Sequence, residues 1–505
     1  MKVTEIQSIL PLLIFIIPIA FSIPILTLGR TYKIFREKWA LGGLIATLAV
    51  AVLIYQQIIP KAELKALVWD RWFYLDGLSL LLEFVVSIMG IIILLYSPAY
   101  LTKRAPGGVI SEAKLSLYYG LLLLFVGLMN WASASNSIIM LYVTLEGSTL
   151  STVYLVAFDW EKRSLEAGFK YLLLISVGMI FSLLGGILLY CVSGDAVPLF
   201  LSRLGGKVTE FPHTIALVSC GPFIAGFGTK AGLIPFHAWL PDAHAEAPAP
   251  ISVLLSGVVI KMGAYALART VTVFAPYLRE VVILMVLIGS VTMILGIIMA
   301  LTQDDLKRLL AYSSVSEMGF IVSGLGLGTY LGLYGGLFHL VNHTFMKGLL
   351  FFCSGALLYA AGTRKISELR LVPKRMLVTS FCFFVAALAM GGMPPFNGFL
   401  SSLTLFLALS ESNLFWASII LIVASFLTLV TLTWAGYRIF WTKPAPELVP
   451  VLANPGPKEA KEVPSLMWGG MLFLAILCVL FGVYPQMVYP LLNSAVNGIL
   501  AISAP

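Results

Sequence analysis

Long apolar segments alternate with short polar connections along almost the whole chain. About fourteen of these segments are roughly 20 residues long, the length at which a helix crosses a hydrocarbon layer of about 30 Å. The pattern predicts an all-α polytopic membrane protein with about fourteen transmembrane helices. The longest polar connection, 438–464, is rich in Pro, Glu and Lys and is too short for a soluble domain, which needs roughly 50 residues.

The expected helices are numbered one to fourteen in chain order, and their approximate bounds are 9–28, 39–59, 76–101, 115–132, 137–158, 168–192, 213–239, 249–269, 281–301, 309–327, 332–361, 376–409, 413–442 and 466–491. Helices one and two contain no charged residue, so we interpret them as scaffold. Helix six is rich in glycine, which favours close packing against a neighbouring helix.

Prolines interrupt two of the expected helices at corresponding places. Helix seven is broken at Pro235, and helix twelve at Pro394 and Pro395. A proline inside a spanning helix removes a backbone hydrogen bond, which is tolerated where protein or a water-filled cavity surrounds the break. Paired interrupted helices indicate an inverted repeat with its transport path near the breaks.

The breaks divide the chain into repeats of five helices, with Pro235 of helix seven matched to Pro394 of helix twelve. Each break lies in the fourth helix of its unit, and five is an odd number, so two successive units must insert in opposite senses. We therefore expect two inverted repeats. The predicted division of the chain is 1–112 (helices one to three), 113–270 (first repeat, helices four to eight), 271–442 (second repeat, helices nine to thirteen) and 443–505 (a loop and helix fourteen).

Composition agrees with a membrane location. Hydrophobic residues make up 59% of the chain and charged residues 11%, compared with about 25% charged residues in soluble domains. The N-terminus has little basic character and no small-residue cleavage pattern, so we expect a retained first helix instead of a signal peptide. The five cysteines are scattered singly through apolar segments, which indicates packed thiols and no metal site: Cys191, Cys220, Cys353, Cys382 and Cys478.

The net charge of +8 reflects topology more than an anionic partner. About 21 of the 32 Lys and Arg residues lie in loops that follow odd-numbered helices, and about 8 lie at the N-terminus or after even-numbered helices. Since basic loops stay in the cytoplasm, we predict a protein of the cell membrane with both termini on the outer side. The loops predicted in the cytoplasm are Arg30–Lys38, Lys103–Lys114, Arg364–Arg375 and Arg438–Lys461.

Three charged residues of the first repeat lie deep inside apolar segments. Glu146 occurs in YVTLEGSTLSTVYL of helix five, Lys230 precedes the break in helix seven, and Lys261 occurs in VVIKMGAYAL of helix eight. A charged side chain at the bilayer centre costs roughly 2.5–3.5 kcal/mol on insertion scales and usually faces a protein interior or a water-filled path. We therefore expect all three to be functional, with Glu146 either neutral or paired.

Helix eleven carries His339, His343 and Lys347, which are spaced four residues apart and lie on one helix face. Such a row can pass protons with intervening waters, because histidine titrates near neutral pH. Two other interpretations are a haem ligand set and plain interhelical hydrogen bonding. Two histidines on one face of one helix cannot bind an iron from opposite sides, which disfavours haem.

Three residues are secondary candidates. His237 follows the first break, Glu317 lies in the hydroxyl-rich start of helix ten, and Glu83 lies about two turns inside helix three. Oxygen atoms near Glu317 leave sodium coordination open, although the lysines favour protons. For Glu83, a structural interpretation is as good as a functional one. In it, the carboxylate accepts a hydrogen bond from a neighbouring hydroxyl or reaches the membrane interface.

The sequence contains no motif for covalent catalysis, nucleotide hydrolysis or cofactor binding. There is no P-loop, no GxGxxG in a βαβ setting, no zinc motif and no nucleophile elbow. We expect no catalytic residues, no metal site and no cofactor. The chain would at most be the ion-translocating subunit of an oxidoreductase complex.

Three strings of the sequence carry a resemblance to a known family: TKAGLIPFHAWLPDAHAEAPAPISVLLSG, DDLKRLLAYSSVSEMGF and NHTFMKGLLFFCSG. They resemble the proton-translocating antiporter-like subunits of respiratory complex I, Mrp-type cation/proton antiporters and membrane-bound hydrogenase or sulfur-reducing complexes. The likeness extends from DGLSLLLEF to GGMPPFNGF and therefore covers most of the chain. It implies fourteen helices and two proton half-channels joined by a polar axis at mid-membrane.

The resemblance assigns roles to five of the candidate residues. Glu146 resembles the glutamate of helix five in this family, and Lys230 the lysine of helix seven that pairs with it. Lys261 resembles the bridging lysine of helix eight, and His339 and His343 resemble the relay of helix eleven. The implied partners are other membrane subunits, with or without a peripheral iron–sulfur arm, and lipid; no nucleic acid is expected.

One position departs from the family pattern. The family usually has a lysine or glutamate in helix twelve shortly after the break, where this chain has Ser402. The second half-channel then lacks its terminal ionisable group, and Lys347 is the nearest basic residue that could replace it. The alternative is a degenerate copy that works beside a second, complete copy in the same complex.

The sequence therefore predicts a proton-translocating subunit of a multisubunit respiratory-type complex. In this hypothesis Glu146 stabilises protonated Lys230, and a charge change from a neighbouring subunit opens the pair and drives the proton toward Lys261. Two rival hypotheses are a structural membrane arm with vestigial charges and a stand-alone secondary transporter of a small anion or amine.

Overall fold

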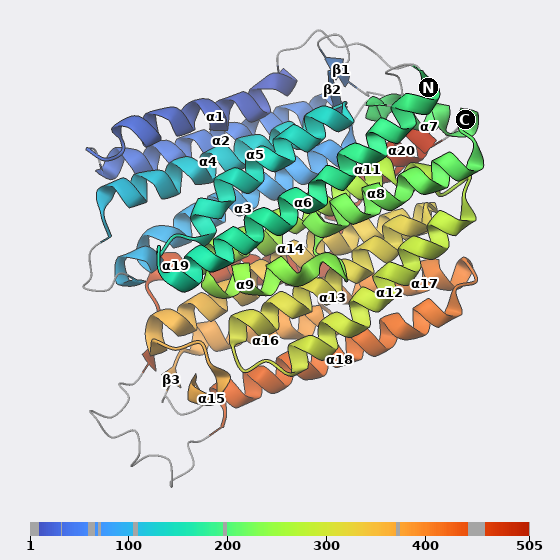
Figure 1. Cartoon of the computed structure of the whole chain (residues 1–505). Coiled ribbons are helices and arrows are strands. Elements are labelled where there is room, and N and C mark those ends of the chain that lie inside the picture. The colour runs from blue at the N-terminus through green and yellow to red at the C-terminus, as the bar shows by residue number, and fades with distance from the viewer. Residues whose placement is uncertain are drawn as a thin grey trace.

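The computed structural model describes most of the chain, in eight stretches: 10–31, 33–58, 66–68, 72–104, 110–194, 199–369, 374–442 and 460–503. The middle parts of three predicted cytoplasmic loops lie outside the described residues, namely 105–109, 370–373 and 443–459. The described part is a bundle of long, roughly parallel and antiparallel helices (Figure 1).

The predicted polytopic architecture is confirmed. Thirteen helices of the described residues are long and apolar enough to cross a membrane by length and composition. Of the fourteen predicted helices, only helix twelve is missing from this set, because its described residues form two shorter pieces. Helices one to six are α1 (Leu10–Leu28), α2 (Lys33–Ile58), α3 (Gly77–Arg104), α4 (Glu112–Ala134), α5 (Ile138–Val156) and α6 (Lys162–Ser193).

Helices seven and eight are composite. Helix seven consists of α8 (His213–Ala231) and α9 (Trp239–Glu246), and helix eight of α10 (Ala249–Leu254) and α11 (Ile260–Thr270), which a π-helical turn connects. Helix seven was predicted to end at residue 239, yet the helix α9 continues it to Glu246. Helices nine to fourteen are α12 (Arg279–Leu301), α13 (Leu306–Leu327), α14 (Tyr330–Ala361), α16 (Leu377–Met390) with α17 (Asn397–Glu411), α18 (Phe415–Phe440) and α19 (Ser465–Val483).

Small elements cover both ends of the bundle. At the end that carries the chain termini in Figure 1 lie the helices α7 (Leu201–Lys207) and α20 (Tyr489–Ser503) and the antiparallel pair of β1 (Ala66–Val68) and β2 (Phe73–Leu75). At the opposite end lie α15 (Ile366–Leu369) and β3 (Lys374–Arg375), which pairs in parallel with β4 (Ala460–Lys461).

Local sequence signals set the ends of the central helices. The Asp305 side chain accepts hydrogen bonds from the first free backbone amides of α13, and Thr329 does the same for α14. Gly328 and Gly362 end these two helices in the left-handed conformation, which glycine adopts without steric cost. The chain therefore begins and ends the two longest buried helices of the second half by its own local chemistry.

The innermost helices are those that carry charged residues. The candidate span of helix eight is completely buried within the bundle and that of α13 is 94% buried, whereas the spans of α1 and α6 are 33% and 39% buried. Outer helices expose apolar side chains such as Phe169, Val177 and Ile419. Charged groups inside a membrane face the protein interior, and this arrangement places them there.

The two breaks share one backbone geometry. Gly232 and Gly392 both adopt left-handed φ angles, 72° and 68°, and the next residue in each case donates a backbone hydrogen bond five residues back, to Gly228 and Leu388. Matching the two glycines aligns Pro235 with Pro395 and not with Pro394, so the predicted register was wrong by one residue. In the same register, Met390 of the second repeat occupies the position that corresponds to Lys230 of the first.

Candidate functional site

Lys230 is completely buried near the end of α8, just before the break. Its ammonium donates hydrogen bonds to the Leu145 carbonyl (2.8 Å), the Ser148 hydroxyl (3.0 Å) and the Thr149 hydroxyl (2.8 Å) of α5. An ammonium has three protons, so these acceptors use its full donor capacity. The hydroxyl-rich sequence after Leu145 thus forms a binding site for a protonated lysine.

Glu146 lies beside this site but is turned away from it. Its Oε2 accepts a hydrogen bond from Ser176 of α6 (2.7 Å), and its Oε1 has no hydrogen-bond partner within the described residues. Glu146 interacts electrostatically with Lys230, yet no direct ion pair joins the two in the described part of the chain. The family-like pair of Glu146 and Lys230 is therefore open in this structure.

Lys261 connects the two halves of the molecule. It lies in α11 of the first repeat, and its Nζ is 2.6 Å from Nδ1 of His343 in α14 of the second repeat. The ammonium also donates to the Ser256 carbonyl in the π-helical turn of its own helix. The π turn leaves this carbonyl accessible, since local unwinding frees backbone groups from regular bonding. Both Lys261 and His343 are completely buried.

The buried row continues from His343 along α14. The rings of His343 and His339 stack with centroids 6.3 Å apart. His339 Nε2 is 2.7 Å from Glu317 Oε2 of α13, and its Nδ1 is 3.0 Å from the Ser401 hydroxyl of α17. One imidazole thus connects the three successive helices ten, eleven and twelve.

Lys347 is the third member of the predicted helix-eleven row, and it is completely buried. Its ammonium donates to the Leu310 carbonyl (3.0 Å) and, at very short range, to the Ser313 hydroxyl, both in α13. Glu317 interacts electrostatically with both Lys347 and Lys261. The structure therefore brings together Lys261, His339, His343, Lys347 and Glu317 in one buried cluster.

Other predicted residues lie outside this cluster. His237 is half-buried at the first break, and its Nδ1 has no partner among the described residues. Glu83 is buried in α3, where Ser133 donates to it at 3.3 Å. Ser402 is half-buried next to Ser401, which is the serine that faces His339.

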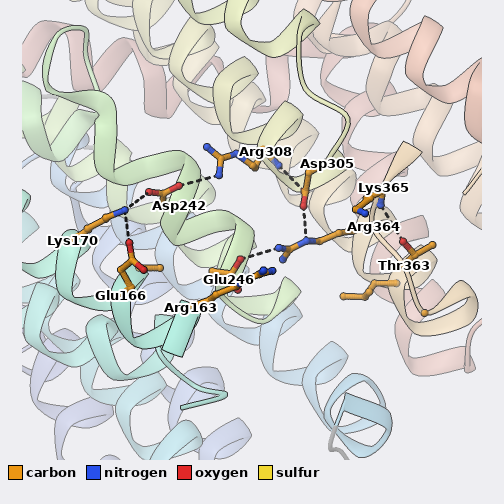
Figure 2. A pocket seen from close by; sticks show the side chains of 13 residues that line it. Arg163, Glu166, Lys170, Asp242, Glu246, Asp305, Arg308, Thr363, Arg364 and Lys365 are labelled. Atoms are coloured by element: carbon orange, nitrogen blue, oxygen red, sulfur yellow. Dashed lines mark hydrogen bonds and ion pairs between the residues drawn. The ribbon is translucent and has the colours of Figure 1, made fainter. Parts of the chain in front are cut away.

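A charged pocket of about 650 Å³ opens at the end of the bundle that carries α15 (Figure 1), and Figure 2 shows the side chains that line it. Its walls come from α6 and α9 of the first repeat and from the start of α13 and the loop after α14 in the second. Figure 2 shows two ion-pair chains across it: Glu166–Lys170–Asp242–Arg308 and Glu246–Arg364–Asp305.

Sequence reasoning did not nominate two buried basic side chains, His244 of α9 and Lys307 of α13. His244 stacks on Phe351 with ring centroids 4.6 Å apart, and neither ring nitrogen has a partner within the described residues. It interacts electrostatically with Lys261, Lys307 and Lys347. Lys307 donates to the Ala247 carbonyl at the end of α9. His244 lies beyond the predicted end of helix seven at residue 239, and the helix α9 that occupies this stretch turns its side chain inward.

The opposite end of the bundle contains a buried ion pair that the sequence did not predict. Arg269 of α11 donates to both carboxylate oxygens of Asp76 (2.7 and 2.5 Å), and its guanidinium lies over the rings of Tyr74 and Tyr265. Asp76 also accepts from two backbone amides at the start of α3. Helix eight was predicted to end at Arg269, and nothing local in the sequence indicates the partner of this residue.

No group of three or more His, Cys, Asp or Glu side chains suited to a metal ion occurs among the residues that the structure describes. The buried groups are lysines, histidines, hydroxyls and single carboxylates. Such groups hold and exchange protons.

Comparison with known proteins identifies the architecture. The family model described as "NADH:quinone oxidoreductase/Mrp antiporter, TM" matches residues 135–428, more than half of the chain. The chain belongs to this family. The predicted resemblance is therefore confirmed, and the matched residues include both breaks and every member of the buried cluster.

Two curated relatives illustrate the breadth of the family. NADH-quinone oxidoreductase subunit N of Desulforudis audaxviator is 32% identical over 497 residues, which are 95% of this chain and 96% of the relative. Na(+)/H(+) antiporter subunit A1 of Staphylococcus haemolyticus is 33% identical over 550 residues. That alignment includes 100% of this chain but 64% of the relative, so the chain spans less than two thirds of that protein.

Solved structures share the fold over nearly the full length. A chain of the archaeal membrane-bound sulfane sulfur reductase superposes with a TM-score of 0.86 at 25% identity, covering 98% of this family member and 99% of that chain. Chains of the Mrp complex from Dietzia sp. DQ12-45-1b (TM-score 0.82, 21% identity) and of complex I from Thermus thermophilus (0.72, 22%) have the same fold. These relatives are subunits of multisubunit membrane complexes.

Proposed function

We propose that this chain translocates protons as an antiporter-like subunit of a multisubunit membrane complex. The observation that carries the proposal is the 2.6 Å contact between Lys261 and His343, which joins the two repeats through completely buried, proton-exchanging groups. Burying such groups in a membrane protein is costly, so their presence in one contiguous cluster supports ion transport.

In the first half, Lys230 would alternate between two acceptor sets. The structure holds it on the carbonyl and hydroxyls of α5, with Glu146 bound to Ser176. Rotation of Glu146 toward Lys230 would favour the charged lysine, and release of Glu146 would let desolvation favour the neutral form. The proton affinity of Lys230 would thus depend on the position of one carboxylate.

A proton released by Lys230 would pass to Lys261 and then into the second half. The helices α8 and α11 pack closely here, because Gly263 lies directly against the backbone of Ala231. No direct contact joins the two ammonium groups in the described residues, so waters would complete this step. From Lys261 the direct hydrogen bond leads to His343 and the stacked ring of His339.

A neighbouring membrane subunit would cover the face of α5 and α6 that carries Glu146. Val143, Leu150 and Tyr154 on this face are more than half exposed, and Glu146 between them is incompletely covered. A carboxylate that faced lipid at this depth would cost several kcal/mol. A partner helix that covers this face would remove the cost, and a charge on that partner could set the position of Glu146.

The charged pocket would be the cytoplasmic entrance. Arg364 and Lys365 of the predicted loop 364–375 line it, and basic loops stay in the cytoplasm. Asp242 and Glu246 of α9 line the pocket, while His244 of the same helix turns toward the buried lysines. In this orientation α7, α20 and both chain termini would lie outside.

The direct test is Lys230→Ala in the assembled complex, reconstituted in sealed vesicles with its native driving reaction. We expect proton translocation to fall by at least about tenfold, because positioned proton-transfer groups contribute roughly 10²–10⁴-fold to a rate. Lys207→Ala is the matched control, since Lys207 pairs with Glu210 at the surface. Unchanged proton translocation in Lys230→Ala, with the complex intact, would leave a structural membrane arm as the better account.

A further inference from the structure

We propose that Glu317 and Lys347 are the second-half counterparts of Glu146 and Lys230, so that the missing ionisable group of helix twelve is replaced from helices ten and eleven. The inference rests on the proposed function and extends it. The residue that carries it is Glu317, which forms the terminal proton site of the second half together with His339 and Ser401.

Helix twelve supplies no ionisable side chain near its break. The matched left-handed glycines place Met390 where the first half has Lys230. Ser402, at the position where the family pattern expects a lysine or glutamate, is half-buried. A second half that worked only through helix twelve would have no proton carrier there.

The lysine-binding site of the first half recurs in the second. Lys230 donates to a carbonyl of α5 and to the hydroxyl three residues further along, Leu145 and Ser148. Lys347 does the same on α13, where it donates to the Leu310 carbonyl and the Ser313 hydroxyl. Helix five and helix ten are the second helices of their repeats, so the same part of each repeat holds a buried lysine by the same pair of acceptors.

Each of these two helices also carries a carboxylate that uses only one of its two oxygens in a hydrogen bond among the described residues. Glu146 uses one oxygen for Ser176, and Glu317 uses one for His339, while Oε1 of both has no partner among the described residues. Glu317 is 1% exposed, and the ionisable groups that interact with it come from two helices: Lys261 of α11, and His339 and Lys347 of α14. A carboxylate in this position can balance whichever of these cations is protonated.

The contact of Glu317 with His339 provides a place for one transferable proton. When His339 is protonated, transfer of the proton from its Nε2 to Glu317 Oε2 converts an ion pair into two neutral groups without changing the net charge. The Ser401 hydroxyl at Nδ1, 3.0 Å away, keeps the imidazole oriented during this exchange and leads into α17. The proton then has a bound position at the helix-twelve side of the bundle.

The test compares Glu317→Gln with Glu146→Gln in the assembled, vesicle-reconstituted complex. We expect both to reduce proton translocation at least about tenfold, while the matched control Glu280→Gln, at the surface beside His213, keeps the wild-type rate. If Glu146→Gln loses translocation and Glu317→Gln keeps it, the inference is wrong and the proposed function stands. If both variants keep the wild-type rate, the proposed function itself is wrong.

A second pair of variants covers the case in which Glu317→Gln does not assemble. Ser401→Ala removes the other partner of His339 with little change in volume, and Ser402→Ala makes the same change one residue away. We expect translocation to fall several-fold in Ser401→Ala alone. Equal, wild-type rates in both serine variants would overturn the role of this site, whatever the fate of Glu317→Gln.

Discussion

At the scale of single residues, the buried charges divide into a mobile set and a fixed set. The mobile set comprises Lys230, Lys261 and Lys347, whose ammonium groups donate to neutral acceptors: carbonyls, hydroxyls and an imidazole. A lysine on such acceptors can lose its proton without leaving an unpaired carboxylate behind. Arg269 instead forms a two-point ion pair with Asp76 between two tyrosine rings. An arginine cannot lose its proton in a protein, so this pair holds the bundle together and carries no proton.

The fixed pair gives a stability prediction. Asp76→Asn leaves the Arg269 guanidinium buried without its counter-ion, and removal of one partner of a buried ion pair costs about 3–5 kcal/mol. We expect the purified complex to unfold at a lower temperature, as measured by thermal denaturation. The control Glu368→Gln removes a pair with Lys365 that is largely exposed, and such pairs contribute little. Similar unfolding temperatures for the two variants would show that the Asp76 pair is not a structural clamp.

At the scale of helices and breaks, the sequence predicted the elements well because their signals are local. Apolar length marked the spanning helices, and Pro235 and Pro395 marked the two interruptions. The register of the repeat was wrong by one residue, since the left-handed glycines that align the breaks depend on backbone geometry. The helix α9 was not predicted, because its polar residues Asp242 and His244 find their partners on α13 and α14, which are distant in the sequence.

The candidate site was predicted in part for the same reason. Spacing alone put His339, His343 and Lys347 on one face, and the structure shows all three buried in one cluster. The partners were not predictable, because each lies on another helix: Ser148 for Lys230, and Ser401 for His339. Pairing across helices depends on packing, which a single sequence does not encode locally.

The proposed proton transfer from Lys230 to Lys261 depends on the close contact between helices α8 and α11. A methyl group added at Gly263 would overlap the backbone of Ala231 and push the two helices apart. Overpacking of this kind costs typically about 1–3 kcal/mol. We expect Gly263→Ala to lower both the unfolding temperature and the proton translocation per assembled complex. Gly221→Ala in α8 is the control, because nothing lies within 4 Å of the added atom there. Identical behaviour of the two variants would show that this close approach is not needed.

At the scale of the whole molecule, two repeats of similar construction meet at one buried contact. Each repeat has a broken helix, a lysine held by a carbonyl and a hydroxyl, and a carboxylate on its second helix. Lys261 of the first repeat and His343 of the second connect them at 2.6 Å. The two repeats therefore form one continuous proton path only if Lys261 releases and regains a proton.

The most direct measurement of this central claim is proton translocation by the vesicle-reconstituted complex with Lys261→Arg beside Lys261→Met. Arginine keeps the positive charge but cannot release its proton, so the account predicts that both variants assemble and both lose translocation. A role for Lys261 as a fixed charge predicts instead that arginine preserves activity. Wild-type translocation in Lys261→Arg would contradict the proposed proton path.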